Sequence, residues 1–226
     1  MNSAVLTPQK HFEPTEPQCG AELVGERIWN LLVAIEQFSK SWVVHGVPTI
    51  HSYGRLPDEE EIRAWAVPRS TGYWLHSLTR LTGAKTVFEI GTSFGYSTLW
   101  LASGLVANDG RIYTCELFEP KMEIAKQHFA QSGLRNIELL SGDAVKTTNR
   151  WDKRIDILFL DADPENYCTY WSALKPWLHQ DSIVIMDNAV NHRSITEPFI
   201  QKIAHEEGWM SWVVPFDHGL LFAKRK

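Results

Sequence analysis

Apolar positions recur with two different periods along this chain, and the change of period divides it in two. From Ala21 to about Val44, apolar residues follow the three- and four-residue spacing of an amphipathic helix. The polar residues 1–20 before it contain three prolines and predict an irregular arm. A long glycine- and proline-bearing loop follows, after which Asp58 predicts the cap of a short helix over 59–65. A further helix is predicted from Pro68 to about Leu81.

After Leu81, short apolar runs alternate with helical segments. Strands are predicted over Thr86–Ile90, Arg111–Glu116, Asn136–Leu140, Ile155–Leu160, Ser182–Met186, Trp209–Val214 and Leu220–Lys224. Helices are predicted between them, over 95–105, 120–132, 164–178 and 196–207. This alternation predicts an α/β fold with a mostly parallel sheet, helices on both faces and a final antiparallel hairpin. Residues 1–67 then form an N-terminal arm and a helical cap or dimerisation segment, and residues 68–226 form the main domain.

The composition is that of an ordinary globular protein and narrows the classes of function. Of 226 residues, 44% are hydrophobic, and the formal net charge is −5. The acidic balance argues against a nucleic-acid partner. The three cysteines lack the spacing of a zinc site or a disulfide framework, and neither a signal peptide nor a membrane span is visible. We therefore expect a cytoplasmic protein without a membrane partner.

The first candidate chemistry follows the strand Thr86–Ile90, because ligands of open α/β sheets bind beyond the carboxyl ends of the strands. The segment there is Glu89-Ile90-Gly91-Thr92-Ser93-Phe94-Gly95-Tyr96-Ser97, whose two glycines allow a tight turn close to a ligand. The middle glycine of the dinucleotide fingerprint is absent, which disfavours a dehydrogenase. The acid before the turn would repel a pyrophosphate but attract a cationic amino-acid ligand. By itself, the segment could equally be a plain turn.

The next two strand ends add to this pattern. Glu116 ends its strand where a carboxylate suits the two hydroxyls of a ribose. Gly142-Asp143-Ala144 follows the third strand, where it could line an adenine pocket or Asp143 could cap a helix. Together, and in this order, the strand ends indicate a site for an adenosine cofactor.

Oxygen ligands follow the fourth and fifth strands. Asp161-Ala162-Asp163 and Asp187-Asn188 stand at ends that we expect to be adjacent. Two carboxylates and an amide oxygen, from Asp161, Asp187 and Asn188, suit Mg²⁺ or Ca²⁺. The alternatives are that Asp161 is a buried acid bonded to neighbouring amides and that Asp163 caps the helix that Pro164 begins.

In combination, these segments resemble S-adenosylmethionine-dependent O-methyltransferases of the catechol and caffeoyl-coenzyme A type. The resemblance covers roughly residues 68–226 and is carried by residues 81–92, Gly95-Tyr96-Ser97, residues 159–163 with 165–167, and Met186-Asp187-Asn188. It implies a Rossmann-like, seven-stranded sheet with the last strand antiparallel, and a small hydroxylated, catechol-like substrate. It implies cofactor contacts at Glu89, Gly91, Thr92, Ser93, Gly95, Ser97, Glu116, Asp143, Ala144 and Asp161. It also implies a divalent metal on Asp161, Asp187 and Asn188.

One position departs from that family. A lysine is expected three residues after the first metal-binding aspartate, where it acts as the general base, and Pro164 stands there instead. Either a bound metal alone acidifies the substrate hydroxyl or another side chain takes the proton. We name His192, with Asp161, as the candidate catalytic pair, although His192 could equally be an exposed loop residue; His45 and His51 are weaker candidates for the base.

Other functions stay open at this stage. One is a metal-independent methyltransferase that acts on nitrogen, carbon, an isolated hydroxyl or a tRNA base, the last with a basic channel built from residues such as Arg55, Arg63 and Arg69. Another is a protein that binds the cofactor without turnover. The extended N-terminal segment favours a homodimer.

Overall fold

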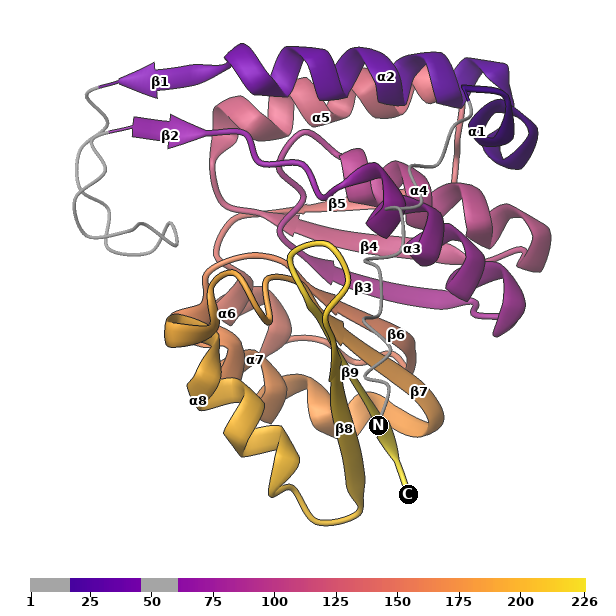
Figure 1. Ribbon diagram of the computed structural model, residues 1–226. Coiled ribbons are helices and arrows are strands. Elements are labelled where there is room, and N and C mark those ends of the chain that lie inside the picture. Colours follow the sequence, from indigo (N-terminus) through magenta and orange to yellow (C-terminus); the bar gives the residue numbers. More distant parts are fainter. Residues whose placement is uncertain (1–16, 46–60) are drawn as a thin grey trace, which may run out of the picture.

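A seven-stranded sheet runs through the middle of the molecule, with helices on both faces (Figure 1). The computed structural model describes residues 17–45 and 61–226 of the chain. Across the sheet the strands lie in the order β5 (Ile137–Ser141), β4 (Arg111–Glu116), β3 (Thr86–Ile90), β6 (Ile155–Leu160), β7 (Leu178–Met186), β9 (Leu220–Arg225) and β8 (Trp209–Val214).

The direction of the strands confirms the predicted Rossmann-like sheet. Strands β3 to β7 pair in parallel, whereas β9 runs antiparallel to both of its neighbours. The central strands β3 and β6 are apolar almost throughout because helices cover both faces of the sheet. In register, Ile90 lies level with Cys115 on one side and Leu160 on the other. The carboxyl ends of β3, β4 and β6 therefore meet at one edge.

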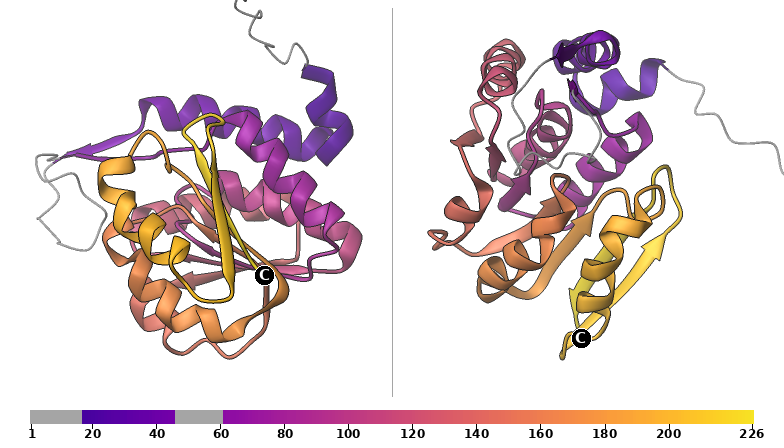
Figure 2. Two further views of the ribbon diagram at one scale, coloured as in Figure 1. Left: turned by 60° about the horizontal axis from the view of Figure 1, so that its bottom comes forward. Right: turned by 90° about the vertical axis from the view of Figure 1, so that its left-hand side faces the viewer.

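The helices form two layers, which the right-hand view of Figure 2 separates. One apolar core joins the sheet to α2 (Glu26–Ser41), α3 (Arg69–Leu81), α4 (Tyr96–Leu105) and α5 (Glu119–Ser132). The other joins it to α6 (Ala144–Thr148), α7 (Tyr167–Leu174) and α8 (Arg193–Ala204). Short 3₁₀ turns are η1 (Val106–Asn108), η2 (Pro164–Asn166) and η3 (Lys175–Trp177).

The N-terminal segment differs from the predicted single helix over 21–44. The chain forms α1 (Pro17–Val24) and then α2, because Gly25 between them has a φ of 84°, a left-handed conformation that ends a helix. The helix predicted over 59–65 is also wrong. Residues Glu61–Arg63 form β2, which pairs with β1 (Val43–His45) in a two-stranded antiparallel sheet.

Some predictions fall outside the described residues, namely the irregular arm up to residue 16, Asp58, and the loop that holds His51 and Arg55. Elsewhere the differences are local. The helix predicted over 164–178 is interrupted at both ends by η2 and η3, each of which contains a proline. The five-residue helix α6 is too short to produce a recognisable period. Among the described helices, none has the length and apolar character needed to cross a membrane.

Candidate functional site

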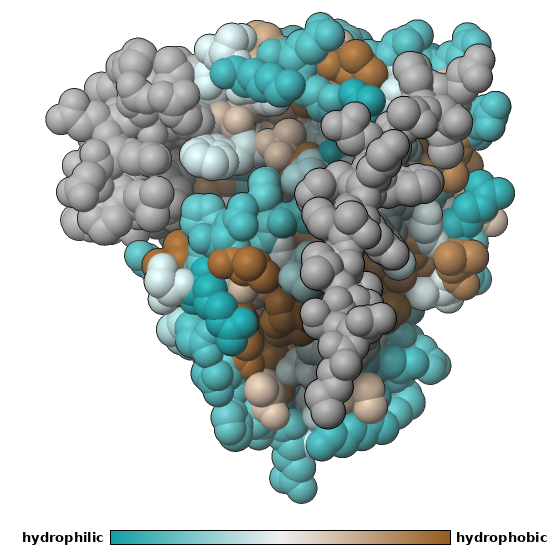
Figure 3. All heavy atoms as spheres, viewed as in Figure 1, coloured by the Kyte–Doolittle hydropathy of each residue, from teal (hydrophilic) through white to brown (hydrophobic). Residues whose placement is uncertain are grey.

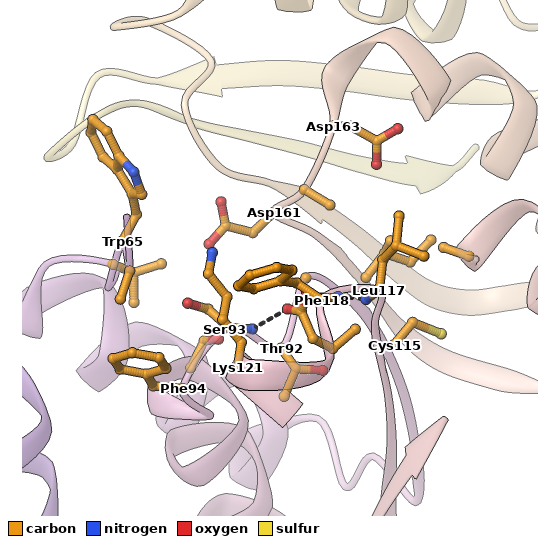
Figure 4. A pocket seen from close by; sticks show the side chains of 18 of the residues that line it. Trp65, Thr92, Ser93, Phe94, Cys115, Leu117, Phe118, Lys121, Asp161 and Asp163 are labelled. Carbon is orange, nitrogen blue, oxygen red and sulfur yellow. Dashed lines mark hydrogen bonds between the residues drawn. The ribbon is translucent and has the colours of Figure 1, made fainter. Parts of the chain in front are cut away.

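A pocket of about 280 Å³ opens at the edge where the parallel strands end (Figure 4). Backbone hydrogen bonds join the neighbouring strand ends beneath it. The amide of Gly91 donates to the carbonyl of Cys115 (3.1 Å), that of Asp161 to Ile90 (2.9 Å), and that of Asp187 to Leu160 (3.0 Å). These bonds hold the loops after β3, β4, β6 and β7 at fixed positions around one cavity.

The turn after β3 requires glycine at its first position. Gly91 has a φ of 107°, and a Cβ there would lie 1.9 Å from the carbonyl oxygen of Asp161. Gly95 also has a positive φ, of 83°, and a Cβ there would lie 2.4 Å from the ring of Phe129. Gly91 lines the pocket together with the predicted residues Thr92, Ser93 and Ser97, whereas Gly95 shapes the turn from behind.

Glu89 lies beneath the turn, outside the pocket lining, and is fully buried. Its carboxylate accepts hydrogen bonds from the hydroxyls of Ser97 (2.6 Å), Thr114 (2.6 Å) and Thr98. Burial raises the pKa of Glu89 to about 7, although these bonds lower it. The structure thus gives Glu89 the position of a support for Ser97 rather than of a wall residue.

Glu116 is held rigidly at the pocket wall by three backbone amides. Oε2 accepts from Ser93 (2.7 Å), and Oε1 accepts from Leu117 (3.0 Å) and Phe118 (2.9 Å). Ser93 reaches this position with a positive φ of 47°. A carboxylate fixed in this way keeps lone pairs for two ligand hydroxyls without having to reorganise.

Asp143 caps a helix and also lines the pocket. Its Oδ1 accepts from the amide of Val145 (2.8 Å), which caps α6, and both Asp143 and Ala144 line the pocket.

Asp161, Asp187 and Asn188 come together at the ends of β6 and β7, as predicted. The side-chain amide of Asn188, a residue with a φ of 64°, donates to Oδ1 of Asp161 over 3.4 Å. Burial raises the pKa of both carboxyl groups, and the charge of Asp187 raises that of Asp161 further. Asp161 and Asn188 line the pocket, whereas Asp187 lies behind them. Its Oδ1 is buried and has no hydrogen-bond partner in the described part of the chain.

The segment around Pro164 corrects one alternative. Asp163 does not cap the following turn through a backbone amide. Its Oδ1 accepts instead from the hydroxyl of Tyr170 (2.8 Å), and its Oδ2 accepts from the side chain of Asn166. The side chain of Asp163 therefore joins η2 to α7, and its carbonyl accepts a backbone bond from the amide of Asn166 (3.1 Å).

His192 lies at the start of α8, half-buried in the pocket wall, rather than on an exposed loop. Burial raises the pKa of Asp187, whereas the charges of His218 and His192 act to lower it. Of the two weaker candidates, His45 belongs to β1, which pairs with β2, and His51 falls outside the described residues.

Sequence reasoning missed many of the pocket residues, and several of these are aromatic. Trp65, Phe94, Phe118 and Tyr170 line the pocket, and Trp65 is 61% exposed. Lys121, from the first turn of α5, also reaches into it (Figure 4). Leu117 and Phe118 could have been found because they directly follow the strand-end acid, but the direction of Lys121 depends on where α5 begins.

Comparisons with known proteins agree with this arrangement. A family model described as O-methyltransferase matches residues 52–213. A Mycobacterium leprae protein named as an O-methyltransferase is 32% identical over 182 residues, which cover 74% of this chain and 81% of that protein. A Mycobacterium avium protein of the same name is 29% identical over 206 residues, covering 83% and 92%.

Solved structures show the same fold. The Bacillus cereus O-methyltransferase in complex with SAH superposes with a TM-score of 0.69 at 25% identity, covering 87% of this chain and 91% of that one. An O-methyltransferase of tomaymycin synthesis from Streptomyces achromogenes, in complex with SAM, gives a TM-score of 0.65 at 25% identity, covering 89% and 90%. The chain therefore belongs to the O-methyltransferase family and is a methyltransferase, as its resemblance implied.

Proposed function

We propose that this methyltransferase takes its methyl group from S-adenosylmethionine and transfers it to a hydroxyl oxygen of a small, catechol-like substrate. One observation carries the proposal: the glycine turn, Glu116 and Asp161 line a single pocket at the carboxyl ends of parallel strands. The SAH and SAM complexes of the two solved relatives support the choice of cofactor.

Residues of the pocket suit each part of the cofactor: the amino acid, the ribose and the adenine. The turn at Gly91 lets the ligand approach the backbone closely, and Ser97 adds a hydroxyl beside the amino-acid portion. The fixed carboxylate of Glu116 would accept the ribose hydroxyls. Asp143 and Ala144 would flank the adenine, and Asp161 would accept hydrogen bonds from the amino group.

Asp161, Asp187 and Asn188 fit a divalent cation. Two carboxyl groups lie close enough for one to raise the pKa of the other, and a buried oxygen of Asp187 has no partner among the described residues. A cation of Mg²⁺ type would compensate both features. Only two of these three ligands are acids, and the third is an amide. Across the described residues, no cluster of three or more His, Cys, Asp or Glu side chains could hold a metal.

Catalysis then rests mainly on positioning. When bound, the cofactor supplies an electrophilic methyl group on its sulfonium, and the cation acidifies the acceptor hydroxyl. The bound cofactor would pass this methyl group to the acceptor oxygen, and its sulfur would keep the electron pair of the broken carbon–sulfur bond. Gly91 and Glu116 would hold the donor, and His192, which lines the same pocket, would take the hydroxyl proton.

The proposal is tested with labelled cofactor, Mg²⁺ and a panel of catechols. We expect methyl transfer that a chelator abolishes and that Asp187→Asn lowers by roughly 100-fold or more, because that variant removes a metal-binding charge. Asp181→Asn is the control, since its exposed side chain lies on β7 far along the strand from Asp187. Absence of any cofactor binding would end the proposal.

Two observations favour a metal-independent enzyme as the second candidate. Pro164 replaces the family's lysine, and Asp187 does not line the pocket. Turnover that survives both chelation and Asp187→Ala would support this candidate. A tRNA acceptor receives less support, because Arg69 is bonded by the carboxylate of Glu36 rather than presented to a ligand.

We also propose that the chain forms a homodimer. Large apolar side chains stand exposed on α3 and β8, with Trp74, Met210 and Trp212 each about half exposed. Hydrophobic residues also gather near the middle of the face seen in Figure 3. Such surface is typical of a contact between subunits. Light scattering behind a sizing column would give twice the 25.9 kDa chain mass, and a monomer mass would refute this.

A further inference from the structure

Lys121 is a partly buried cation that the proposed mechanism does not use. It rises from the first turn of α5, and Figure 4 shows its nitrogen directed toward the carboxylate of Asp161 across the pocket. Within the described residues, its ammonium makes neither a hydrogen bond nor an ion pair. Burial lowers the pKa of Lys121, although the carboxylates of Glu116 and Asp161 raise it.

The charged side chains that line the pocket are mainly acidic, and acidic side chains cannot bind the carboxylate of S-adenosylmethionine. Glu116, Asp143, Asp161 and Asp163 all line the pocket, and among the described lining residues Lys121 is the one lysine or arginine. S-adenosylmethionine carries two cationic groups, the ammonium and the sulfonium, and one anionic group, the α-carboxylate. The acidic wall matches the cations, so the carboxylate needs a donor or a positive charge of its own.

The position of Lys121 suits the α-carboxylate of the cofactor. The nitrogen is directed toward Asp161, beside which the amino-acid portion of the cofactor would lie if Glu116 takes the ribose. We propose that Lys121 binds the α-carboxylate of the cofactor. The pocket therefore binds ligands that carry this carboxylate more tightly than ligands that lack it. This inference rests on the proposed function. A lysine there also repels the sulfonium, which would favour the neutral thioether product over the substrate.

The test compares two neutral-sulfur ligands that differ in one group. S-adenosylhomocysteine carries the carboxylate, and its decarboxylated analogue, with an aminopropyl chain, lacks it. Calorimetric titration is made with the wild type, with Lys121→Met, which keeps the length of the side chain, and with Lys126→Met. Lys126 lies on the same helix, exposed and paired with Glu123 (2.6 Å), and is the matched control.

We expect Lys121→Met to weaken S-adenosylhomocysteine roughly 10- to 100-fold, as for the loss of a charge-assisted hydrogen bond. Binding of the decarboxylated analogue should change less than about threefold, and Lys126→Met should change neither. The variant should fold, because it removes a partly buried charge that makes no hydrogen bond or ion pair in the described structure.

The outcomes distinguish a failure of the proposed role of Lys121 from a failure of the proposed function. Equal weakening of both ligands, or unchanged affinity for S-adenosylhomocysteine, overturns the role of Lys121 while leaving the cofactor site intact. A wild-type protein that binds neither compound overturns the proposed function itself.

Discussion

At Gly91 the chain passes so close to the next loop that a single methyl group cannot be added. The Cβ of an alanine would meet the backbone of Asp161, which cannot move without shifting the end of β6. Gly142 has nearly the same φ, 106° against 107°, but nothing lies within 4 Å of a Cβ there. This pair of glycines separates the effect of crowding from that of backbone strain.

We therefore expect Gly142→Ala to lower the free energy of unfolding by about 1–3 kcal/mol, through strain alone. Gly91→Ala should lower it clearly more and should also weaken cofactor binding. Urea denaturation of the two variants measures the difference. Equal unfolding midpoints would show that the contact with Asp161 relaxes easily and does not constrain the turn.

Burial of Glu89 predicts a distinctive dependence of stability on pH. Its pKa is about 7 in the folded protein, against an ordinary value of 4.5, so the folded state binds the proton more tightly between these values. Stability is therefore lost as the pH rises from about 4.5 to 7 and then levels off. The isosteric Glu89→Gln cannot titrate and removes this contribution.

The free energy of unfolding of the wild type, minus that of Glu89→Gln, should fall by roughly 3 kcal/mol across this window. Chemical denaturation at a series of pH values measures it. A difference that stays constant, or that rises with pH, would mean that Glu89 is ionised in the folded protein.

Sequence reasoning located those residues whose position follows from a strand end. Gly91, Glu116 and Asp161 were predicted at the rim and line the pocket, because each ends or directly follows a short apolar strand. The partners of Asp163 were not predictable. Its bond to Tyr170 depends on η2 and α7 meeting at a particular angle, and no local pattern records that angle.

Among the elements, α2 is attached beside the pocket by one polar cluster. Glu36 accepts two bonds from Arg69 at the start of α3 (2.9 and 2.6 Å) and one from Tyr96 of α4. The guanidinium of Arg69 also lies 4.7 Å from the centre of the Trp29 ring. Because Tyr96 lines the pocket, this cluster couples the N-terminal helix to the cofactor turn.

Glu36→Gln should lower the free energy of unfolding by about 1–2 kcal/mol, since it removes a charge-assisted, bidentate contact that is partly shielded from water. Amide exchange in α2 should speed up more than in β3 or β6. Glu123→Gln breaks the exposed pair with Lys126 and is the control, expected to change stability by less than about 0.5 kcal/mol. A similar loss in both variants would contradict the attachment.

The strands were predicted more accurately than the helices, for a physical reason. β3, β4 and β6 begin and end at the predicted residues, because burial between two helical layers requires continuous apolar runs with polar ends. The bounds of the edge strand β8 were also predicted, although most of its residues are not buried. The N-terminal helices were misjudged since Gly25 can be tolerated within a helical pattern or can end it. Short elements such as β2 and α6 are formed by pairing or capping rather than by their own periodicity.

At the scale of the whole molecule, the strand order brings the candidate site residues together around one cavity. Strand order places β3 between β4 and β6, so three loops from distant parts of the sequence surround one cavity. Helix α2 lies against the cavity and places Ile35 and Ser39 in its wall. The division at residue 67 stays a prediction, because α2 shares an apolar core with α3 and α4.

A crystal structure with bound S-adenosylhomocysteine tests the central claim most directly. We predict that the ribose hydroxyls contact Glu116, that the amino-acid portion lies between the Gly91 turn and Asp161, and that Lys121 meets the carboxylate. Electron density for the ligand on any other face of the molecule would contradict the account.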